Sequence, residues 1–539
     1  MNAELSRNAL NPASNDSARS AKAHLVGGGI GSLAAAAFMI RDGGMTGSNI
    51  TIYESMPVLG GSLDAAGDAE TGYTMRGGRM LTTDNYECTW GLFDTIPSLV
   101  NPGRSVRDDT LAFNEAHVSN AGARLVDANR HRLAVKSMGF SMSDRMELFK
   151  LVEADEAALG RTCVTDWLSP PFFQTNFWFM WATTFAFQPW HSAVEFRRYL
   201  HRFMLEFTRI ETLAGVKRTV FNQNDSLVAP LVAWLRDAGV QFAVNCEVTD
   251  IALADDGKMI IAKSLILKRP EGDATVLVND GDLVFFQNGS MTDASSYGAM
   301  DAAPAHLTKA DSGGWALWER LAAGRPEFGD PAAFNTSIPE SSWESFTVTL
   351  HDGAFFDAMQ AFTGNVAGTG GLVTFKDSNW LMSVVLAHQP HFANQPKGVQ
   401  VFWGYALHPD RIGDFVAKPM GDCTGADILQ ELCGHLNFDR GVFARANCIP
   451  CLMPYITSMF MPRGAGDRPL PVPANSRNFA FISQFVELPE DVVFTVEYSV
   501  RAAQTAVYRL LGIDKSIPPV LRHDQSIKVQ FDALLKAFA

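Results

Sequence analysis

Glycines near the N-terminus and an acidic residue after the next apolar run have the types and spacing to bind a dinucleotide. Gly27, Gly29 and Ser32 follow the first apolar run. Glu54 directly follows the second apolar run. Such glycines let the backbone approach a pyrophosphate at a helix N-terminus, and the acid accepts hydrogen bonds from ribose hydroxyls. Because strand, helix, strand and acid occur in this order, the pattern favours dinucleotide binding over a structural glycine turn.

A tyrosine in the run WHSAVEFRRYL has the chemistry of a general acid. Tyr199 carries a phenol that could donate a proton in a reaction. However, Phe196, Tyr199, Leu200 and Phe203 recur at helical spacing, which is typical of a core-facing stripe. From the residues alone, a structural tyrosine is the more common interpretation.

Two short motifs resemble metal sites, and neither has a complete ligand set. Cys448 and Cys451 form a single CxxC without a second pair. His388 and His391 are separated by Pro390, which prevents a regular helical pair of ligands. We therefore predict no metal.

Composition narrows the class of protein and its partners. A chain of 539 residues, 47% of them hydrophobic, can form two or three domains with a large core. Its 37 Phe and 11 Trp permit a large apolar cavity, although a bulky core would need them too. A net charge of −14 excludes a nucleic-acid partner, which requires clustered Lys and Arg.

The cysteines and the hydropathy of the sequence indicate which cellular compartment the protein is expected to occupy. Seven scattered cysteines without an apolar leader indicate a reducing, cytoplasmic setting. No apolar run is long enough to span a membrane, since a span needs about 18 to 20 residues. We expect the polar residues 1–21 to form a flexible tail.

The predicted strands and helices that carry these residues indicate an α/β fold. Strands are expected at 23–26, 50–53, 240–251 and 282–286, a helical segment at 109–210, and a strand, turn and long helix after 477. The returning strands predict a discontinuous, Rossmann-like nucleotide-binding domain with an inserted α+β substrate domain. Its pieces are 22–110, 211–300 and 475–512, and the substrate-binding regions are 111–210 and 301–474.

The C-terminal segment 513–539 ends in an amphipathic helix. Its apolar residues share one face and its charged residues lie elsewhere. That face could contact a membrane surface, its own chain or a second subunit. The nearly balanced charge predicts weak attraction to anionic lipid.

Nine motifs spread from about residue 22 to 512 resemble the oleate hydratase family, once called myosin-cross-reactive antigens. They are GGGIGSLAAAAF, GGSLD, RGGRM, YECTWGLF, WHSAVEFRRY, NGSMTD, KPMGDCTG, CIPCLMPYITSMFMPR and FVELPEDVVFTVEYSVRAAQ. The resemblance implies an FAD-dependent, redox-neutral lyase with a glutathione-reductase-type FAD domain. Such an enzyme adds water across a cis double bond of an unsaturated fatty acid such as oleate or linoleate. Family members are also thought to contact membranes through the C-terminal segment.

The resemblance assigns the proton donor to Tyr199 and reveals a departure at its partner. The family's water-activating glutamate follows RGGR, and Met80 stands there, as it does in some branches. Methionine cannot accept a proton. Either water captures the developing cation without a dedicated base, or Asp84 or Glu87 replaces the glutamate. The alternative for those two acids is a loop contact and a helix cap.

Cofactor and head-group contacts also follow from the resemblance. FAD contacts fall on Gly27, Gly29, Gly31, Ser32, Glu54, Ser62, Leu63, Arg79, Val248, Ser290, Thr495 and Ser499. Gly77 and Gly78 either let the backbone approach the isoalloxazine ring or form an ordinary turn. The family's T-x-N-R-Q-P-H pattern becomes Val385, Ala387, His388, Gln389, Pro390 and His391, so two polar head-group contacts are missing while His391 remains. Gln223 matches a further head-group contact.

Two other functions fit the same motifs. One is a flavin-dependent isomerase or desaturase of unsaturated fatty acids. The other is a non-catalytic, flavin-containing fatty-acid-binding protein in which Met80 marks lost catalysis. The preferred fatty acid, the regiochemistry and the oligomeric state stay open.

Overall fold

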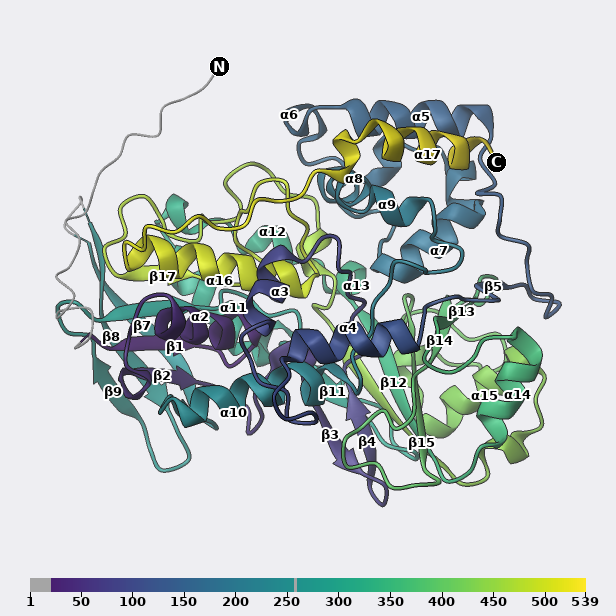
Figure 1. The fold of residues 1–539 in the computed structure, drawn as a ribbon, viewed down its shortest axis with the longest axis horizontal. Coiled ribbons are helices and arrows are strands. Elements are labelled where there is room, and N and C mark those ends of the chain that lie inside the picture. Colours follow the sequence, from purple (N-terminus) through teal and green to yellow (C-terminus); the bar gives the residue numbers. More distant parts are fainter. Residues whose placement is uncertain (1–20, 256–258) are drawn as a thin grey trace.

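A parallel five-stranded sheet forms the framework of one half of the protein. The computed structural model describes residues 21–255 and 259–539, so most of the expected N-terminal tail lies outside the described residues. The strand order is β17 (Phe479–Phe481), β10 (Leu283–Phe286), β1 (Ala23–Val26), β2 (Ile50–Tyr53) and β6 (Gln241–Ala243). Helices α2 (Ile30–Arg41) and α16 (Val496–Leu510) pack against each other beside it (Figure 1). The predicted α/β class with a parallel sheet is confirmed.

The last residues of the central strands β10, β1 and β2 pair with one another, so these strands end at the same edge of the sheet. Val26 pairs with Tyr53 on one side and with Phe286 on the other. Glycine 27, Glu54 and Gln287 follow these three residues directly. Ligands of open parallel sheets bind at the carboxyl ends of the strands, so the chain places its glycine motif and its acid at that edge.

A seven-stranded sheet forms the second half. It is antiparallel except where β5 pairs with β13. The order is β11 (Ser296–Tyr297), β16 (Ala446–Met453), β12 (Trp343–Leu350), β15 (Gln400–Ala406), β14 (Met382–Leu386), β13 (Gly371–Phe375) and β5 (Leu125–Val126). Alternate residues of β12, such as Phe346 and Val348, pack in a core with α14 (Ala354–Thr363) and α15 (Gly425–Leu436). On the other face, Thr347 and Thr349 accept backbone N–H groups of the small β3–β4 hairpin (Ala65–Asp68 and Gly72–Met75).

The helices within residues 87–207 include α8, which carries the tyrosine of the WHSAVEFRRY motif. They are α3 (Glu87–Phe93), α4 (Val106–Ala116), α5 (Met142–Glu153), α6 (Glu156–Leu159), α7 (Asn176–Phe185), α8 (Ala193–Arg202) and α9 (Met204–Phe207). The remaining helices are α10 (Ala229–Asp237), α11 (Gly313–Ala322), α12 (Ala332–Asn335), α13 (Ile338–Ser341) and α17 (Ile527–Phe538).

The residues of one expected strand form two separate strands. The run VQFAVNCEVTDI was expected to continue as a single strand, and that expectation is wrong. Asn245 adopts a φ of 52°, a left-handed conformation that ends the extended chain. Consequently β6 joins the parallel sheet, whereas β7 (Glu247–Asp255) pairs with β8 (Ile260–Lys268) and β9 (Ala274–Leu277) in a separate sheet.

The C-terminal helix α17 lies beside α5 (Figure 1). The large apolar side chains of α17 are exposed. Arg145 of α5 donates to the carbonyl of Ala537 at 2.8 Å and lies over the ring of Phe538. Ile527 and Phe531 are 84% and 57% exposed. Among the described residues, no helix has both the length and the apolar character required to cross a membrane.

Candidate active site

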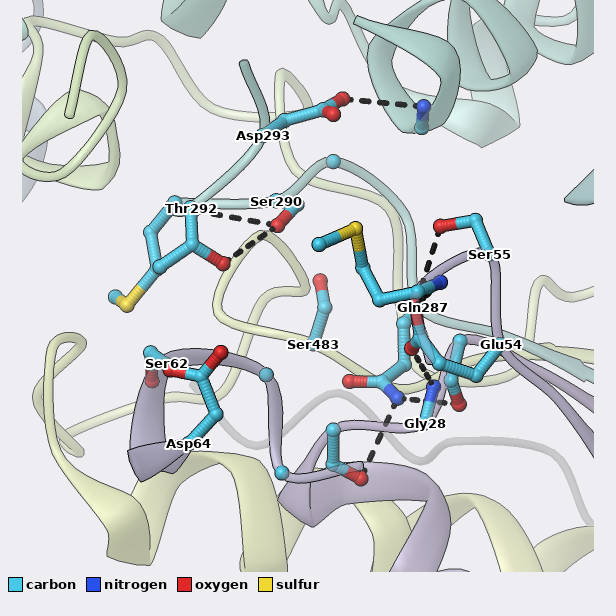
Figure 2. Close-up of a pocket in the computed structure, with 18 of the residues that line it drawn as sticks. Gly28, Glu54, Ser55, Ser62, Asp64, Gln287, Ser290, Thr292, Asp293 and Ser483 are labelled. Carbon is cyan, nitrogen blue, oxygen red and sulfur yellow. Dashed lines mark hydrogen bonds between the residues drawn. The ribbon is translucent and has the colours of Figure 1, made fainter. Parts of the chain in front are cut away.

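A cleft of about 480 Å³ opens at the carboxyl edge of the parallel sheet (Figure 2). Gly27 has a φ of 99°, and Gly29 is the N-cap residue of α2. The N–H of Gly28 donates to the Glu54 carboxylate at 2.7 Å. A Cβ on Gly28 would lie 2.7 Å from Leu59 and 2.9 Å from Glu54, so a side chain there would displace the ends of these two side chains. This is the arrangement that receives a pyrophosphate at a helix N-terminus.

Most residues assigned to the cofactor by resemblance line this cleft. They are Gly27, Gly29, Glu54, Ser62, Leu63, Arg79, Val248, Ser290, Thr495 and Ser499. Gly31, Ser32 and Gly77 do not line this cleft, and Gly78 lines a small neighbouring pocket instead. Gly31 permits close packing instead, because a Cβ there would lie 3.0 Å from the Ile482 carbonyl. Ser32 accepts a hydrogen bond from Gln287 at 2.8 Å, which holds the glycine loop.

Two buried arginines leave donors available in the cleft. Among the described residues, the Arg79 guanidinium has no carboxylate partner, and it donates hydrogen bonds to the Gly77 carbonyl at 3.5 Å and the Met291 sulfur at 3.9 Å. Burial lowers its pKa to about 10, so the group still carries its charge at neutral pH. Arg76 pairs with Asp64 at 2.9 Å, yet its Nη1 has no hydrogen-bond partner. Buried unpaired donors are costly, and acceptors on a bound ligand would satisfy them.

A small apolar pocket of about 60 Å³ adjoins the cleft. Phe185, Phe203 and Trp403 are among its walls. It shares with the cleft the residues Arg79, Phe494, Thr495 and Val496. The two cavities therefore meet at these four residues.

Tyr199 reaches this pocket from α8. The residue is 1% exposed, and its ring contacts those of Phe185, Phe187 and Phe460. Its hydroxyl donates to the Val493 carbonyl at 2.5 Å. Burial raises the pKa of Tyr199 well above its usual value, so the phenol keeps its proton at neutral pH. The structure thus offers a protonated acid beside an apolar cavity and a dinucleotide-sized cleft.

Comparison with known proteins identifies the family. Residues 20–508 match the MCRA family. The chain is 38% identical over 530 residues to an oleate hydratase of Streptococcus pyogenes serotype M49 (strain NZ131), covering 96% of this chain and 89% of that protein. The protein belongs to the MCRA family. The predicted membership in the oleate hydratase family, once called myosin-cross-reactive antigens, is confirmed.

A second relative and a solved structure extend the comparison. A linoleate hydratase of Lactiplantibacillus plantarum is 33% identical over 563 residues, which cover 96% of this chain and 98% of that protein. Cyclohexylamine oxidase from Brevibacterium oxydans IH-35A superimposes with a TM-score of 0.54 at 12% identity, covering 91% of this chain and 99% of that chain. At such low identity the likeness concerns the fold alone.

In this MCRA family chain, the three residues considered as partners of Tyr199 occupy different surroundings. Met80 lines the apolar pocket. Glu87 lies outside it and pairs with Arg202 at 2.7 Å and Arg501 at 2.9 Å. Although burial opposes ionisation, these contacts lower the pKa of Glu87, which makes it a poor base. Asp84 also lies outside the pocket, half-exposed and paired with Arg209 at 3.0 Å.

The residues assigned to the substrate head group do not line either cavity. Gln223 spans the backbone of Arg79, accepting from its N–H at 3.2 Å and donating to its carbonyl at 3.1 Å. Val385 and Ala387 are buried. His391 is buried as well, with an unpartnered Nε2 and a pKa lowered by burial to about 4.

Several residues at the site were not predicted from the sequence. Phe494 separates the two cavities, with a φ of 69° and its ring 5.1 Å from the Arg79 guanidinium carbon. Gln287 follows β10 at the level of the glycine loop, a position that strand pairing could have revealed. Glu206 of α9 also lines the pocket, but both its oxygens contact Arg209.

The CxxC motif lies within strand β16, where its thiols are inert. Burial raises the pKa of Cys451 to about 12 and that of Cys448 still further. All seven cysteines are unpaired. Reactive cysteines need the opposite shift, so this motif is part of the core.

Proposed function

We propose that this protein is a hydro-lyase that adds water across a cis double bond of an unsaturated fatty acid, as in the conversion of oleate to 10-hydroxystearate. The hydratase relatives support the reaction class. The observation that carries the proposal within the chain is the buried, protonated Tyr199 in an apolar pocket that opens onto the dinucleotide cleft.

The reaction needs a proton on one alkene carbon and a hydroxyl on the other. Tyr199 donates its phenolic proton to one carbon, and positive charge develops on the neighbouring carbon. A water molecule bonds to that carbon and releases a proton, which returns to the tyrosinate directly or through solvent. Holding the chain, acid and water in register supplies much of the rate acceleration.

No carboxylate is assigned to the water molecule in this scheme, because both oxygens of Glu206, the acid that lines the pocket, contact Arg209. Met80 occupies the glutamate position, and Asp84 and Glu87 lie outside the pocket. We favour a water molecule oriented by the Arg79–Gly78 backbone and the bound cofactor. Asp84 and Glu87 are thereby assigned to structural ion pairs.

FAD fits the cleft that this chain builds. The glycine loop and Glu54 line the cleft, where backbone N–H groups would hold a pyrophosphate and the acid would accept ribose hydroxyls, and Arg76 and Arg79 have donors to spare. When bound, FAD would supply an electrostatic surface and a shape against which the alkene is held. Its neighbours in this chain would be the ten cleft-lining residues given above, with Gly78 beside the pocket and Gly77 beside Arg79.

The acyl chain must widen the pocket to enter. Pockets for small molecules usually measure about 300 Å³ or more, whereas this one measures about 60 Å³. Binding therefore displaces side chains, and the flexible Met80 is suited to this. The seven free thiols support a reducing, cytoplasmic setting for the reaction.

Lipid would reach the enzyme through the surface formed by α5 and α17. Besides the apolar face of α17, Met142, Met146 and Phe149 of α5 are exposed. Adjacent exposed apolar helices of this kind indicate a binding surface. We assign it to peripheral membrane contact.

Isotope labelling tests the function. The protein is incubated with FAD, a reductant and oleate in heavy-oxygen water, and the mass of the product is measured by mass spectrometry. Hydration gives a hydroxy acid that carries the label. An isomer of unchanged mass, a product lighter by two hydrogens, or tight oleate binding without turnover would instead favour the isomerase, the desaturase or the binding protein.

A further inference from the structure

A cluster of two carboxylates and an imidazole lies apart from both cavities. Glu431 and His435 are one turn apart on α15, and Asp414 comes from the loop that follows β15. Their ligand-type atoms all lie within 4.8 Å of one another. His435 Nε2 is 3.3 Å from Glu431 Oε1 and 3.6 Å from Asp414 Oδ2.

The imidazole nitrogen faces the carboxylates without a hydrogen bond. His435 is nine-tenths buried, and its Nε2 has no partner of hydrogen-bond geometry. Its ring stacks on Phe375 at 5.2 Å and meets the edge of Phe415 at 5.1 Å. The two phenyl rings thus fix the direction in which Nε2 points.

The cluster carries more negative charge than its surroundings balance. Glu431 is fully buried, and its oxygens accept the N–H groups of Asp414 at 2.7 Å and Phe415 at 2.8 Å. Burial opposes its ionisation, but the imidazole and these N–H groups outweigh it and lower its pKa. No Lys or Arg of the described chain pairs with either carboxylate. The cluster therefore brings two carboxylates and one imidazole nitrogen within 4.8 Å of one another.

We propose that Asp414, Glu431 and His435 form a binding site for one divalent transition-metal ion, with Zn²⁺ as the best fit. Zinc binds His nitrogen and carboxylate oxygen at about 2.0 to 2.2 Å, which places tetrahedral ligands about 3.3 to 3.6 Å apart. The two imidazole-to-carboxylate separations match this value. A water molecule completes the tetrahedron, and the ion ties the loop after β15 to α15.

Zinc titration of the full-length protein tests the site. Protein stripped with a chelator is titrated with Zn²⁺ by calorimetry, for the wild type, Asp414→Asn and His435→Gln. Asp422→Asn is the matched control, because it removes an acid from an exposed His306–Asp422 pair at 2.9 Å on the same loop. We expect one ion per chain, at least tenfold weaker binding in both cluster variants and unchanged binding in the control.

Two further readouts separate binding from misfolding. Co²⁺ should give visible absorption bands in the wild type that Asp414→Asn lacks, and Asp414 is accessible enough for that variant to fold, with a side chain 30% exposed. Zinc should raise the melting temperature of the wild type and the control but not of Asp414→Asn. Absence of binding to the wild type, or equal binding in all four proteins, would overturn the proposal.

Discussion

The Tyr199 phenol donates to the backbone carbonyl of Val493 at 2.5 Å. Val493 lies in the loop before α16, which also carries Phe494 and Thr495 of the cleft wall. Asp491 fixes this loop by pairing with Arg202 at 3.3 Å and Arg501 at 2.8 Å. The position of the acid and the shape of the cofactor cleft therefore depend on one buried loop.

Replacing Tyr199 with Phe should lower the hydration rate about 10²- to 10⁴-fold, the usual contribution of a general acid. The pocket also contains Tyr86 and Tyr405, which provide matched controls. Product formation from oleate is measured for all three Tyr→Phe variants, with folding checked by circular dichroism. If Tyr405→Phe or Tyr86→Phe lost activity and Tyr199→Phe kept it, the assignment of the acid would be wrong.

Replacing Asp491 with Asn should destabilise the protein and lower kcat more than it raises KM. Breaking a buried ion pair costs about 3 to 5 kcal/mol because the partner charge stays buried. Glu490→Gln is the control, since Glu490 is exposed and pairs only with Arg522. Chemical denaturation and steady-state kinetics measure both effects. If Asp491 positions the acid, its substitution should change little further in a Tyr199→Phe background.

Replacing Arg79 with Gln should weaken FAD binding at least tenfold, because a hydrogen bond from a charged donor is worth about 1.5 to 3 kcal/mol. Arg124→Gln is a suitable control. Burial also lowers the pKa of Arg124 to about 10, but that residue lies outside the cleft. Flavin absorbance during titration gives the affinities, and equal affinities for both variants would argue against a contact from Arg79.

Replacing Glu344 with Gln should stabilise the protein at alkaline pH. Both oxygens of Glu344 are buried without partners, and burial, with Asp422 nearby, raises its pKa well above the usual 4.5. The folded state keeps a proton that the unfolded chain loses above about pH 4.5, so wild-type stability falls as pH rises by up to about 1.4 kcal/mol per unit. Urea unfolding at pH 5 and pH 8 should show the gain at pH 8 only. The exposed Glu340→Gln is the control, and parallel pH profiles for wild type and Glu344→Gln would contradict the expectation.

Replacing Phe531 and Leu535 together with Ser should reduce binding to phosphatidylcholine vesicles. Leu277→Ser is the control, because Leu277 is 69% exposed on β9, away from α17 in Figure 1. Sedimentation with vesicles measures the bound fraction. Added salt should matter little, since the charges of α17 are nearly balanced. Equal sedimentation of all variants would remove the membrane assignment.

Local patterns predicted the parts of this structure that depend on local chemistry. Apolar runs predicted the strands before Gly27 and Glu54, and both strands appear in the parallel sheet. The φ preference of glycine predicted the turn at Gly27, which has a positive φ. The break at Asn245 escaped prediction because a single left-handed residue in an apolar run leaves no periodic signal. The domain boundaries stay a prediction.

Contacts between distant segments were beyond sequence reasoning. Nothing in the run around Val493 indicates that its carbonyl meets a tyrosine almost three hundred positions earlier. Likewise, Asp414 and His435 become neighbours only when the loop after β15 folds onto α15. The placement of Glu87 among arginines depends on α3, α8 and α16 packing together, which no local pattern encodes.

The cofactor cleft is assembled from both ends of the chain, since Gly27 and Ser499 line the same cavity and β17 is the last strand of its sheet. The ribosome must therefore have synthesised the chain through Ser499 before the cleft can close. Until then the glycine loop has no opposite wall, and any truncated product that ends before α16 should remain colourless in the presence of flavin.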